Sequence, residues 1–350
     1  MRRRSRKSTG IEIYRACDED APAGADTSGP EFVSALAHTG IRTRPLLVTG
    51  AGQPSGVAVV RLLAGSGHQV VAVDHDPFAA GMRLAHWGAV VPDACDTDFA
   101  ATLAQVAKRT GARMLIPGDA GEIPALQRSS DVLAQAGLRT WFPEPDVVSV
   151  FRDPWRVHET LSALSLPVTG AAPNSPEGVE GPWKVTSRSD PEKSFHSDLR
   201  GLVRQACAQI GDALVSHSPA GRRFCADLLA DQTHSLVACV AYWHLRSSAF
   251  ISAAETFTSD VITSLAASVC SEIHMQGPAT LAGVVRDDDA VVITDLNLGF
   301  SACTPLCTAA GANLVLAYAN AIGGDDLPDS PMQYRSGVRM VRHLDEVFET

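Results

Sequence analysis

From Pro45 to about residue 150 the chain alternates short apolar runs with segments of helical periodicity. Strands that alternate with helices through short glycine-rich turns indicate a parallel sheet with helices on both faces. The pattern therefore predicts a Rossmann-like α/β domain over residues 45–150. The predicted strands are PLLVTG, HQVVAVDHDP, AVVPD and RMLIPG, and the predicted helices are PSGVAVVRLLAGSG, FAAGMRLAHWG and FAATLAQVAKRTG.

The pattern changes beyond this domain. PEPDVVSVFRDPWRVHETLSALSLPVT predicts two helical segments, and after Gly181 the strands are expected to be antiparallel. This part of the chain is read as α+β. Its predicted strands are PWKVTS, GDALVSHS, RRFCADLLAD and SLVACVAYWHLR; VITSLAASVCSEIHM predicts a helix, TLAGVVRDDDAVVITDLN a hairpin and GANLVLAYANAIGG a final helix. Residues 1–44 lack sustained periodicity and are expected to be mostly disordered, with EFVSALAHTG as a candidate short helix.

Composition narrows the class of protein. A length of 350 residues allows two or three packed units, and 45% hydrophobic residues are typical of a globular protein. No apolar run approaches the roughly 20 residues needed to span a bilayer, so no membrane span is expected. The basic start, MRRRSRKSTG, is followed by no apolar segment and does not make a complete secretory signal. The net charge of −10 argues against binding to nucleic acid.

The cysteines suggest a reducing compartment. The chain has eight, and their scattered positions match neither a zinc motif nor a disulfide framework. We expect reduced, mostly buried thiols in a cytoplasmic protein.

The glycine-rich turn VTGAGQPSG is a first candidate for binding chemistry. Gly50, Gly52 and Gly56 lie between a predicted strand and helix, and Asp74 ends the next strand. A dinucleotide-binding fold places glycines and an acid in this order, but the spacing here is G-x-G-x-x-x-G. None of the four tyrosines has a lysine four residues later. Nicotinamide binding is therefore the lesser interpretation, and a turn that lets the first helix pack on the sheet is favoured.

A second candidate lies near the C-terminus, in AVVITDLNLGF. Asp295 ends an apolar strand and Asn297 follows two residues later. Side chains two apart on a strand point to the same face. Two oxygen donors on one face are suited to a hard cation bound beside a phosphate.

The order of these elements resembles the ATP-grasp superfamily, in particular the free-standing ligases that are similar to carbamoyl-phosphate synthase domains. The resemblance covers roughly residues 45–348. The segments that carry it are LIPGDAGEIPAL with Glu122, FRDPWRVHETLSALSLPV, LVSHSPAGRRFCADLLAD, AAETFTS, TDLNLGFSACTPLCTAAGANL and QYRSGVRMVRHLDEVF.

The resemblance implies a fold and an activity. The expected fold is a Rossmann-like pre-ATP-grasp domain over 45–150, followed by an ATP-grasp domain with a small lid subdomain at 151–215 and a C-terminal subdomain at 216–350. The implied activity is ATP-dependent ligation of a small carboxylate substrate to an amine through an acyl phosphate, with ATP and Mg²⁺ as cofactors. Homodimers are common in the superfamily, so the resemblance allows a homodimer, and the oligomeric state stays open.

The resemblance also assigns roles to single residues. Asp295 and Asn297 are the candidate metal ligands, and Arg188 and Arg246 are the candidate catalytic residues. The candidate nucleotide contacts are Lys184, Arg188, Lys193, His217 and Glu255. Lys184 lies two residues before Thr186, which aligns with the family's phosphate lysine, so both should point to the same face of a strand.

Several family residues are replaced. Pro154 stands where a lysine is usual, Ala282 or Gly283 where a second metal ligand is usual, and Gly299 where an arginine would stabilise the transferred phosphate. The adenine hinge reads Ser216–His217, and Arg223 replaces an acidic ribose contact. Two functions stay open: an active ligase, or a non-catalytic relative that acts as a binding or regulatory module. Convergence of Lys184, Arg188 and Asp295 on one pocket would favour the ligase.

Overall fold

The computed structural model describes residues 11, 13–15, 45–189, 193–247, 251–328, 331–343 and 345–346. The described chain divides into two compact units, one ending at Thr140 and the other spanning Trp141–Glu346. The division falls ten residues before the predicted boundary at 150. Trp141 belongs to the second unit because its ring stacks on Tyr318 at 5.0 Å and its carbonyl oxygen accepts the Tyr318 hydroxyl. The candidate helix EFVSALAHTG lies outside the described residues.

The first unit is built on a five-stranded sheet in the order β1-β4-β3-β2-β5. Strands β2 (Leu46–Thr49), β3 (Val70–Asp74), β4 (Trp87–Val90) and β5 (Met114–Pro117) are parallel, as the sequence predicts. Right-handed crossovers place α2 (Pro54–Gly65) and α3 (Ala80–Leu84) on one face and α4 (Phe99–Thr110) on the other, because the strand order reverses at β2. Two short helices, α5 (Ile123–Arg128) and α6 (Ser130–Gln135), complete the unit.

The expectation that the fold begins at Pro45 is wrong. Strand β1 (Ile13–Arg15) pairs antiparallel with β4, with Tyr14 opposite Gly88. A Cβ atom at Gly88 would lie 2.7 Å from the Tyr14 ring, so the glycine makes room for it. Three residues are too short a segment for periodicity to reveal.

The glycine-rich turn after β2 is tightly packed at Gly56. A Cβ atom on Gly56 would lie 2.0 Å from the carbonyl oxygen of Gly50, and one on Gly118 would lie 2.7 Å from the Gly56 Cα. Asp74, which would hold a ribose in a dinucleotide-binding fold, instead accepts the Gly52 N–H at 2.7 Å. The structure supports the packing interpretation of this turn and not the nicotinamide one.

Glu122 is a buried carboxyl group at the carboxyl end of the same sheet. It ends the short 3₁₀ helix Ala120–Glu122 and is 8% exposed, and its Oε2 atom has no hydrogen-bond partner among the described residues. Burial raises the pKa of Glu122 to about 8, and the charges of Asp119 and Asp74 act in the same direction.

We expect the Glu122→Gln variant to lose a pH dependence that the wild-type protein shows. The unfolded chain releases this proton near its ordinary pKa of 4.5, whereas the folded state keeps it to about pH 8. The folded state binds more protons in that window, so stability should fall as pH rises, by at most about 1.4 kcal/mol per pH unit. Urea unfolding midpoints of both proteins between pH 5 and 8 measure this. Parallel curves for the two proteins would contradict the expectation.

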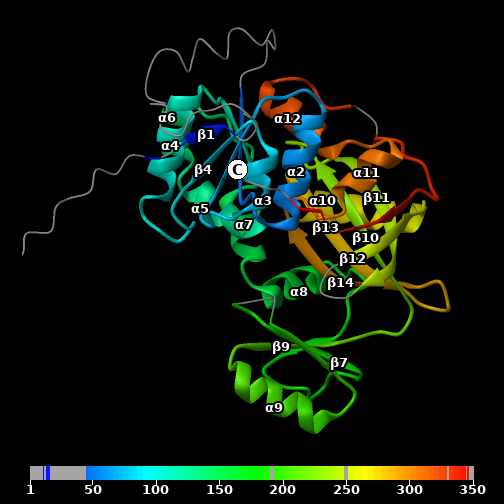
Figure 1. Cartoon of the computed structure of the whole chain (residues 1–350). Coiled ribbons are helices and arrows are strands. Elements are labelled where there is room, and N and C mark those ends of the chain that lie inside the picture. Colours follow the sequence, from blue (N-terminus) through cyan, green and yellow to red (C-terminus); the bar gives the residue numbers. More distant parts are fainter. Residues whose placement is uncertain are drawn as a thin grey trace, which may run out of the picture. The chain divides into compact units, whose positions relative to one another are not determined.

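The second unit begins with two helices, α7 (Pro145–Phe151) and α8 (Pro154–Ala163), which the sequence predicts. A small antiparallel sheet follows, in the order β6-β9-β7-β8, made of Ala171–Pro173, Ala213–His217, Trp183–Ser187 and Ser194–Ser197. Helix α9 (Arg200–Ile210) packs on one face of this sheet (Figure 1), where Trp183, Val185, Val203 and Cys207 form the core. The small sheet ends at His217, within the predicted hinge.

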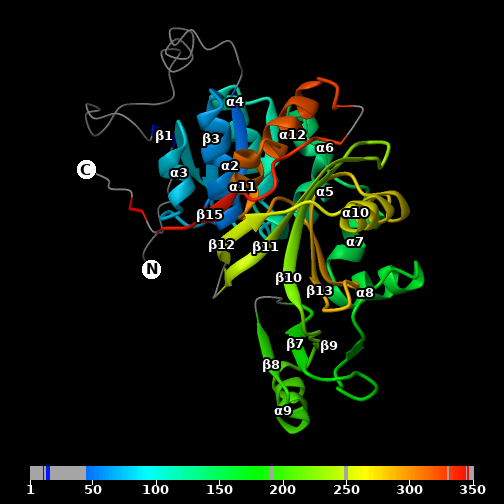
Figure 2. The same cartoon turned by 90° about the vertical axis from the view of Figure 1, so that its right-hand side faces the viewer.

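The rest of the second unit is a six-stranded sheet in the order β14-β13-β10-β11-β12-β15, whose central strands lie side by side in Figure 2. Every neighbouring pair is antiparallel, as predicted. Helix α10 packs against β10 and β11, and α11 and α12 pack against β10, β12 and β13. The bounds are β10 Arg222–Ala230, β11 Leu236–Ser247, β12 Ile251–Thr256, α10 Asp260–Glu272, β13 Gly277–Val285, β14 Val291–Leu298, α11 Thr304–Ala310, α12 Leu314–Gly323 and β15 Arg339–Val341.

No single helix in the described ranges is both long and apolar enough to span a bilayer, and only the bent pair α11–α12 reaches that size when its two helices are counted together.

Candidate functional site

Within the second unit, the small sheet, α8 and the strands β10, β13 and β14 line a cleft of about 400 Å³. That volume is within the range of small-molecule binding sites. Its lining mixes apolar and polar side chains, as that of such sites usually does. The apolar residues include Phe151, Val157, Leu161, Val168, Leu214, Ile293 and Leu296; the polar residues include Arg152, His158, Thr169, Lys184, Thr186, Arg188, Ser216, Thr280, Asp295 and Asn297.

Strand β7 brings Lys184 into this cleft. Lys184 and Thr186 both line the cleft, whereas Trp183 and Val185 lie in the core under α9. The prediction that Lys184 and Thr186 share one face of a strand is confirmed. Lys184 therefore supplies a cation on the strand face where the resemblance leads us to expect one at position 186.

Arg188, just beyond β7, also lines the cleft, but it is held by Asp153. Its Nε donates to Asp153 Oδ1 at 2.9 Å and its Nη2 donates to Oδ2. Asp153 caps α8 by accepting the Trp155 N–H at 2.9 Å. The hydrogen bonds from Arg188 hold the pKa of Asp153 below its ordinary value, so both groups are charged at neutral pH. Arg188 fixes the small sheet to α8 and has fewer donors left for a ligand.

Asp295 and Asn297 project into the cleft from the edge strand β14. In the register with β13, Asp295 is opposite Ala282 and Asn297 is opposite Thr280. The Nζ atom of Lys184 lies 3.3 Å from each carboxylate oxygen of Asp295. An ion pair therefore joins the small sheet to the six-stranded sheet across the cleft.

The donor set can be compared with what Mg²⁺ requires. A carboxylate and an amide oxygen on one strand face suit a hard cation, but Ala282 offers no oxygen where a second acidic ligand would stand. In the described part of the chain, no group of three or more His, Cys, Asp or Glu side chains could hold a metal ion. Because Mg²⁺ commonly takes one or two protein oxygens and completes its shell with phosphate oxygens and water, the residues fit a metal that binds together with a phosphate.

Two of the predicted nucleotide contacts do not line the cleft. Lys193 is exposed just before β8, and its carbonyl oxygen accepts the Ser187 N–H at 3.0 Å. The His217 ring lies 3.0 Å, through Nδ1, from the carbonyl oxygen of Glu180. The His217 backbone bonds Gly170 and Thr169, so this residue serves the connection between the two sheets.

Arg246 and Glu255 lie elsewhere on the six-stranded sheet. Arg246 is exposed on β11 at an irregularity in the pairing with β12. Glu255 on β12 forms an ion pair with Arg339 of β15 and is opposite Trp243. Neither lines the cleft, so the structure gathers only Lys184, Arg188, Asp295 and Asn297 from the predicted set.

The floor of the cleft contains residues that the sequence did not single out. Cys225 and Thr280 line it, and behind them the buried Asp227 accepts hydrogen bonds from Ser301 at 2.7 Å and Tyr242 at 3.0 Å. Burial raises the pKa of Asp227, and these hydrogen bonds oppose that effect. Through Ser301 the network fixes the loop that follows β14, and β14 itself carries Asp295 and Asn297. Only the alternation of Cys225 and Asp227 along one strand could have indicated that they share a face.

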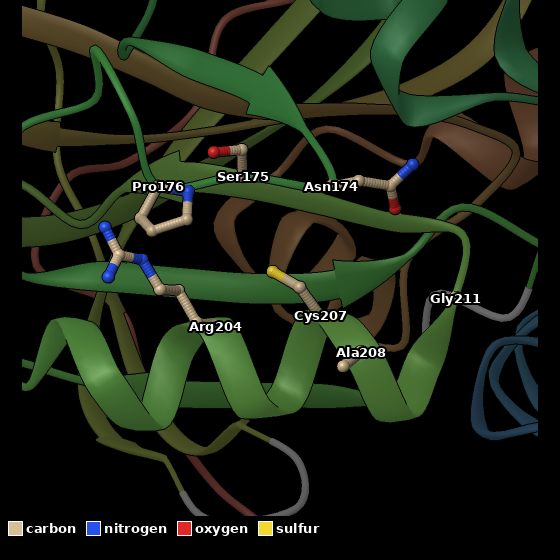
Figure 3. A pocket seen from close by; sticks show the side chains of 7 residues that line it. All are labelled: Asn174, Ser175, Pro176, Arg204, Cys207, Ala208 and Gly211. Atoms are coloured by element: carbon tan, nitrogen blue, oxygen red, sulfur yellow. The ribbon is translucent and has the colours of Figure 1, made fainter.

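A second pocket, on the outer side of the small sheet, is a weaker candidate. It is shallow and lies between α9 and the segment Asn174–Pro176, as Figure 3 shows. Its polar groups already have partners within the subdomain: Arg204 pairs with Glu177, and Asn174 Oδ1 accepts the Ala213 N–H. The cleft around Lys184 and Asp295 is therefore the candidate functional site.

Comparisons with known proteins place this geometry in a structural group. No protein-family model and no curated protein sequence matches the chain. Solved structures match it along most of its length. The biotin carboxylase domain of 2-oxoglutarate carboxylase from Hydrogenobacter thermophilus, in complex with MgADP and bicarbonate, has a TM-score of 0.66 at 13% identity, over 83% of this chain and 72% of that one.

Two further matches are similar in extent. N5-carboxyaminoimidazole synthetase from Staphylococcus aureus, complexed with ADP, gives a TM-score of 0.66 at 11% identity, over 83% of this chain and 80% of that one. L-amino acid ligase from Bacillus licheniformis gives 0.63 at 12% identity, over 80% and 74%. The chain has the ATP-grasp fold of these proteins, as the sequence predicts.

Proposed function

We propose that the protein is an ATP-dependent carboxylate–amine ligase that activates a small acid, amino acid or peptide as an acyl phosphate. The observation that carries the proposal is the convergence of Lys184, Arg188, Asp295 and Asn297 on one cleft between two sheets. The fold supports it, because enzymes with this fold include an L-amino acid ligase and a synthetase solved with ADP.

The lining of the cleft offers both kinds of contact that a nucleotide needs. The apolar side chains of Val168, Leu214 and Ile293 provide a surface for a planar base. The ammonium of Lys184 and the hydroxyl of Thr186 can donate to phosphate oxygens. Asp295 and Asn297 supply oxygens for the accompanying Mg²⁺, which when bound would neutralise the phosphate charge and polarise the transferred group.

A non-catalytic nucleotide-binding module is the second candidate function, and Gly299 favours it. The family's arginine would stand here, but Gly299 has a φ of +84° and its N–H donates to the Pro278 carbonyl oxygen at 2.8 Å. This left-handed conformation favours glycine, so the backbone itself departs from one that carries an arginine. Arg188 does not replace it freely, because Asp153 holds it. A protein without that cation would bind ATP and transfer no phosphate.

Thermal unfolding with MgATP tests whether the cleft binds a nucleotide, which both candidate functions require. We expect millimolar MgATP to raise the melting temperature of the wild-type protein by several degrees and to have little effect on Asp295→Ala, because the metal-bound nucleotide stabilises only the state that binds it. Steady ADP release in the presence of mixed amino acids would support the ligase, and a shift without turnover would support the binding module. The absence of any shift would contradict both.

A further inference from the structure

The ion pair between Lys184 and Asp295 joins the two sides of the cleft. Lys184 lies on β7 of the small sheet, and Asp295 lies on β14, an edge strand of the six-stranded sheet. The ammonium is equidistant from both carboxylate oxygens at 3.3 Å. It thus neutralises the carboxylate that is the only acidic metal ligand that the described cleft offers.

A backbone connection lies beside this contact. Ile293, two residues before Asp295, donates its N–H to the Pro167 carbonyl oxygen at 2.7 Å and accepts the Thr169 N–H at 3.0 Å. In the second connecting segment, which leaves the small sheet after β9, the His217 N–H donates to the Gly170 carbonyl oxygen at 2.8 Å. Two chain segments therefore enter and leave the small sheet next to β14, and this is the geometry of a hinge. The ion pair is a side-chain contact between β14 and the lid, by which we mean β6–β9 with α9.

We propose that Lys184 and a divalent cation compete for Asp295, so that the ion pair closes the ligand-free lid and a phosphate group must engage Lys184 before a metal can bind Asp295. The proposal rests on the proposed nucleotide site. The proposal makes phosphate binding and metal binding cooperative. A phosphate that pairs with the Lys184 ammonium frees the Asp295 carboxylate for the metal, and a metal on Asp295 frees Lys184 for the phosphate.

The ion pair is suited to such an exchange because it is accessible. The Lys184 side chain is 26% exposed and that of Asp295 is 42% exposed. Pairs of this kind shift an equilibrium by about fivefold at most. The contact is thus strong enough to bias the lid and weak enough for a polyphosphate to displace it. Once the polyphosphate has displaced the ion pair, its negative charge lies next to the uncompensated Asp295 carboxylate unless a metal ion binds there.

Binding measurements with and without metal test the competition. For Asp295→Asn we expect ATP in EDTA to bind about three- to fivefold more tightly than to the wild-type protein, because Lys184 is free and the repelling charge is gone. With Mg²⁺ present the same variant should bind more weakly. For Lys184→Gln we expect Mn²⁺ alone to bind about three- to fivefold more tightly. An Asp295→Asn effect of the same sign with and without metal, or an unchanged Mn²⁺ affinity in Lys184→Gln, would overturn the competition.

The closing role of the ion pair has a test that needs no ligand. Cys225 is 7% exposed on the floor of the cleft, so its modification by N-ethylmaleimide should require the lid to open. We expect its labelling rate, followed by peptide mass spectrometry, to rise about three- to fivefold in both Lys184→Gln and Asp295→Asn, and no further in the double variant. Arg200→Gln is the matched control, because it breaks the Arg200–Glu177 pair on the outer side of the lid.

The two tests distinguish two kinds of failure. If ATP binds no variant and Cys225 labelling still responds to both substitutions, the proposed nucleotide site is wrong and the lid contact stands. If Cys225 labels in both cleft variants at the rate seen for Arg200→Gln, the ion pair does not close the lid, and the further inference is overturned whether or not ATP binds.

Discussion

Gly56→Ala is expected to lower the stability of the first unit by about 3 kcal/mol or more. The added Cβ atom would lie 2.0 Å from the Gly50 carbonyl oxygen and 3.1 Å from the Ala51 Cα, so it meets backbone on the turn between β2 and α2. A flexible side chain could move away, but this turn cannot, because Gly118 packs directly on Gly56 from the end of β5. Helix α2 would have to shift from the sheet.

Gly65→Ala provides a control in the same helix. No atom lies within 4 Å of a Cβ built there, so the substitution should leave the melting temperature unchanged or raise it slightly, since alanine favours the helical state. The measurement is thermal unfolding of both variants by circular dichroism. Equal melting temperatures for Gly56→Ala and the wild-type protein would show that the turn is looser than the structure indicates, and would reopen a ligand-binding role for it.

Lys184→Ala is expected to weaken MgATP binding by about 10–100-fold, the cost of one charge-assisted hydrogen bond to a phosphate. The loss arises because the ammonium no longer contacts the phosphates. Release of Asp295, which lies 3.3 Å from the ammonium, favours the metal by about fivefold at most and so offsets only part of the loss. Isothermal titration calorimetry on the full chain measures the affinity.

Lys108→Ala is the matched control, because this lysine is exposed on α4 in the first unit. It should bind MgATP as the wild-type protein does. Raising the salt concentration should reduce the difference between wild-type and Lys184→Ala, because salt screens partly exposed charges. Equal affinities of wild-type and Lys184→Ala at low salt would mean that the nucleotide does not reach β7.

The sequence predicts local order well where one period dominates. The alternation of strand and helix gives the parallel sheet, and the period of two along β7 places Lys184 and Thr186 on one face. Helix α9 was missed although Val203, Cys207 and Ile210 recur at helical spacing, so here the period was present and was overlooked.

Contacts between segments that are distant in the sequence account for the parts of the site that the sequence did not predict. Lys184 and Asp295 are 111 residues apart, and Arg188 and Asp153 are 35 apart, and no spacing rule connects either pair. The Asp–Pro pair at 153–154 indicates a helix start, but not that the capping carboxylate also binds an arginine. For the same reason Glu255, which resembles a family residue in its local segment, lies next to Arg339 and not in the cleft.

Strand β1 changes which part of the chain is dispensable. Tyr14 contacts Met82 through its hydroxyl, and the Arg83 guanidinium lies 4.7 Å from the centre of its ring. A truncation at residue 44, which the polar composition of this region invites, would remove three residues that cover the outer edge of β4. The backbone groups of that edge would then be open to pairing with other chains, and the core would also lose the buried side chain of Ile13, so the shortened protein would be prone to aggregate.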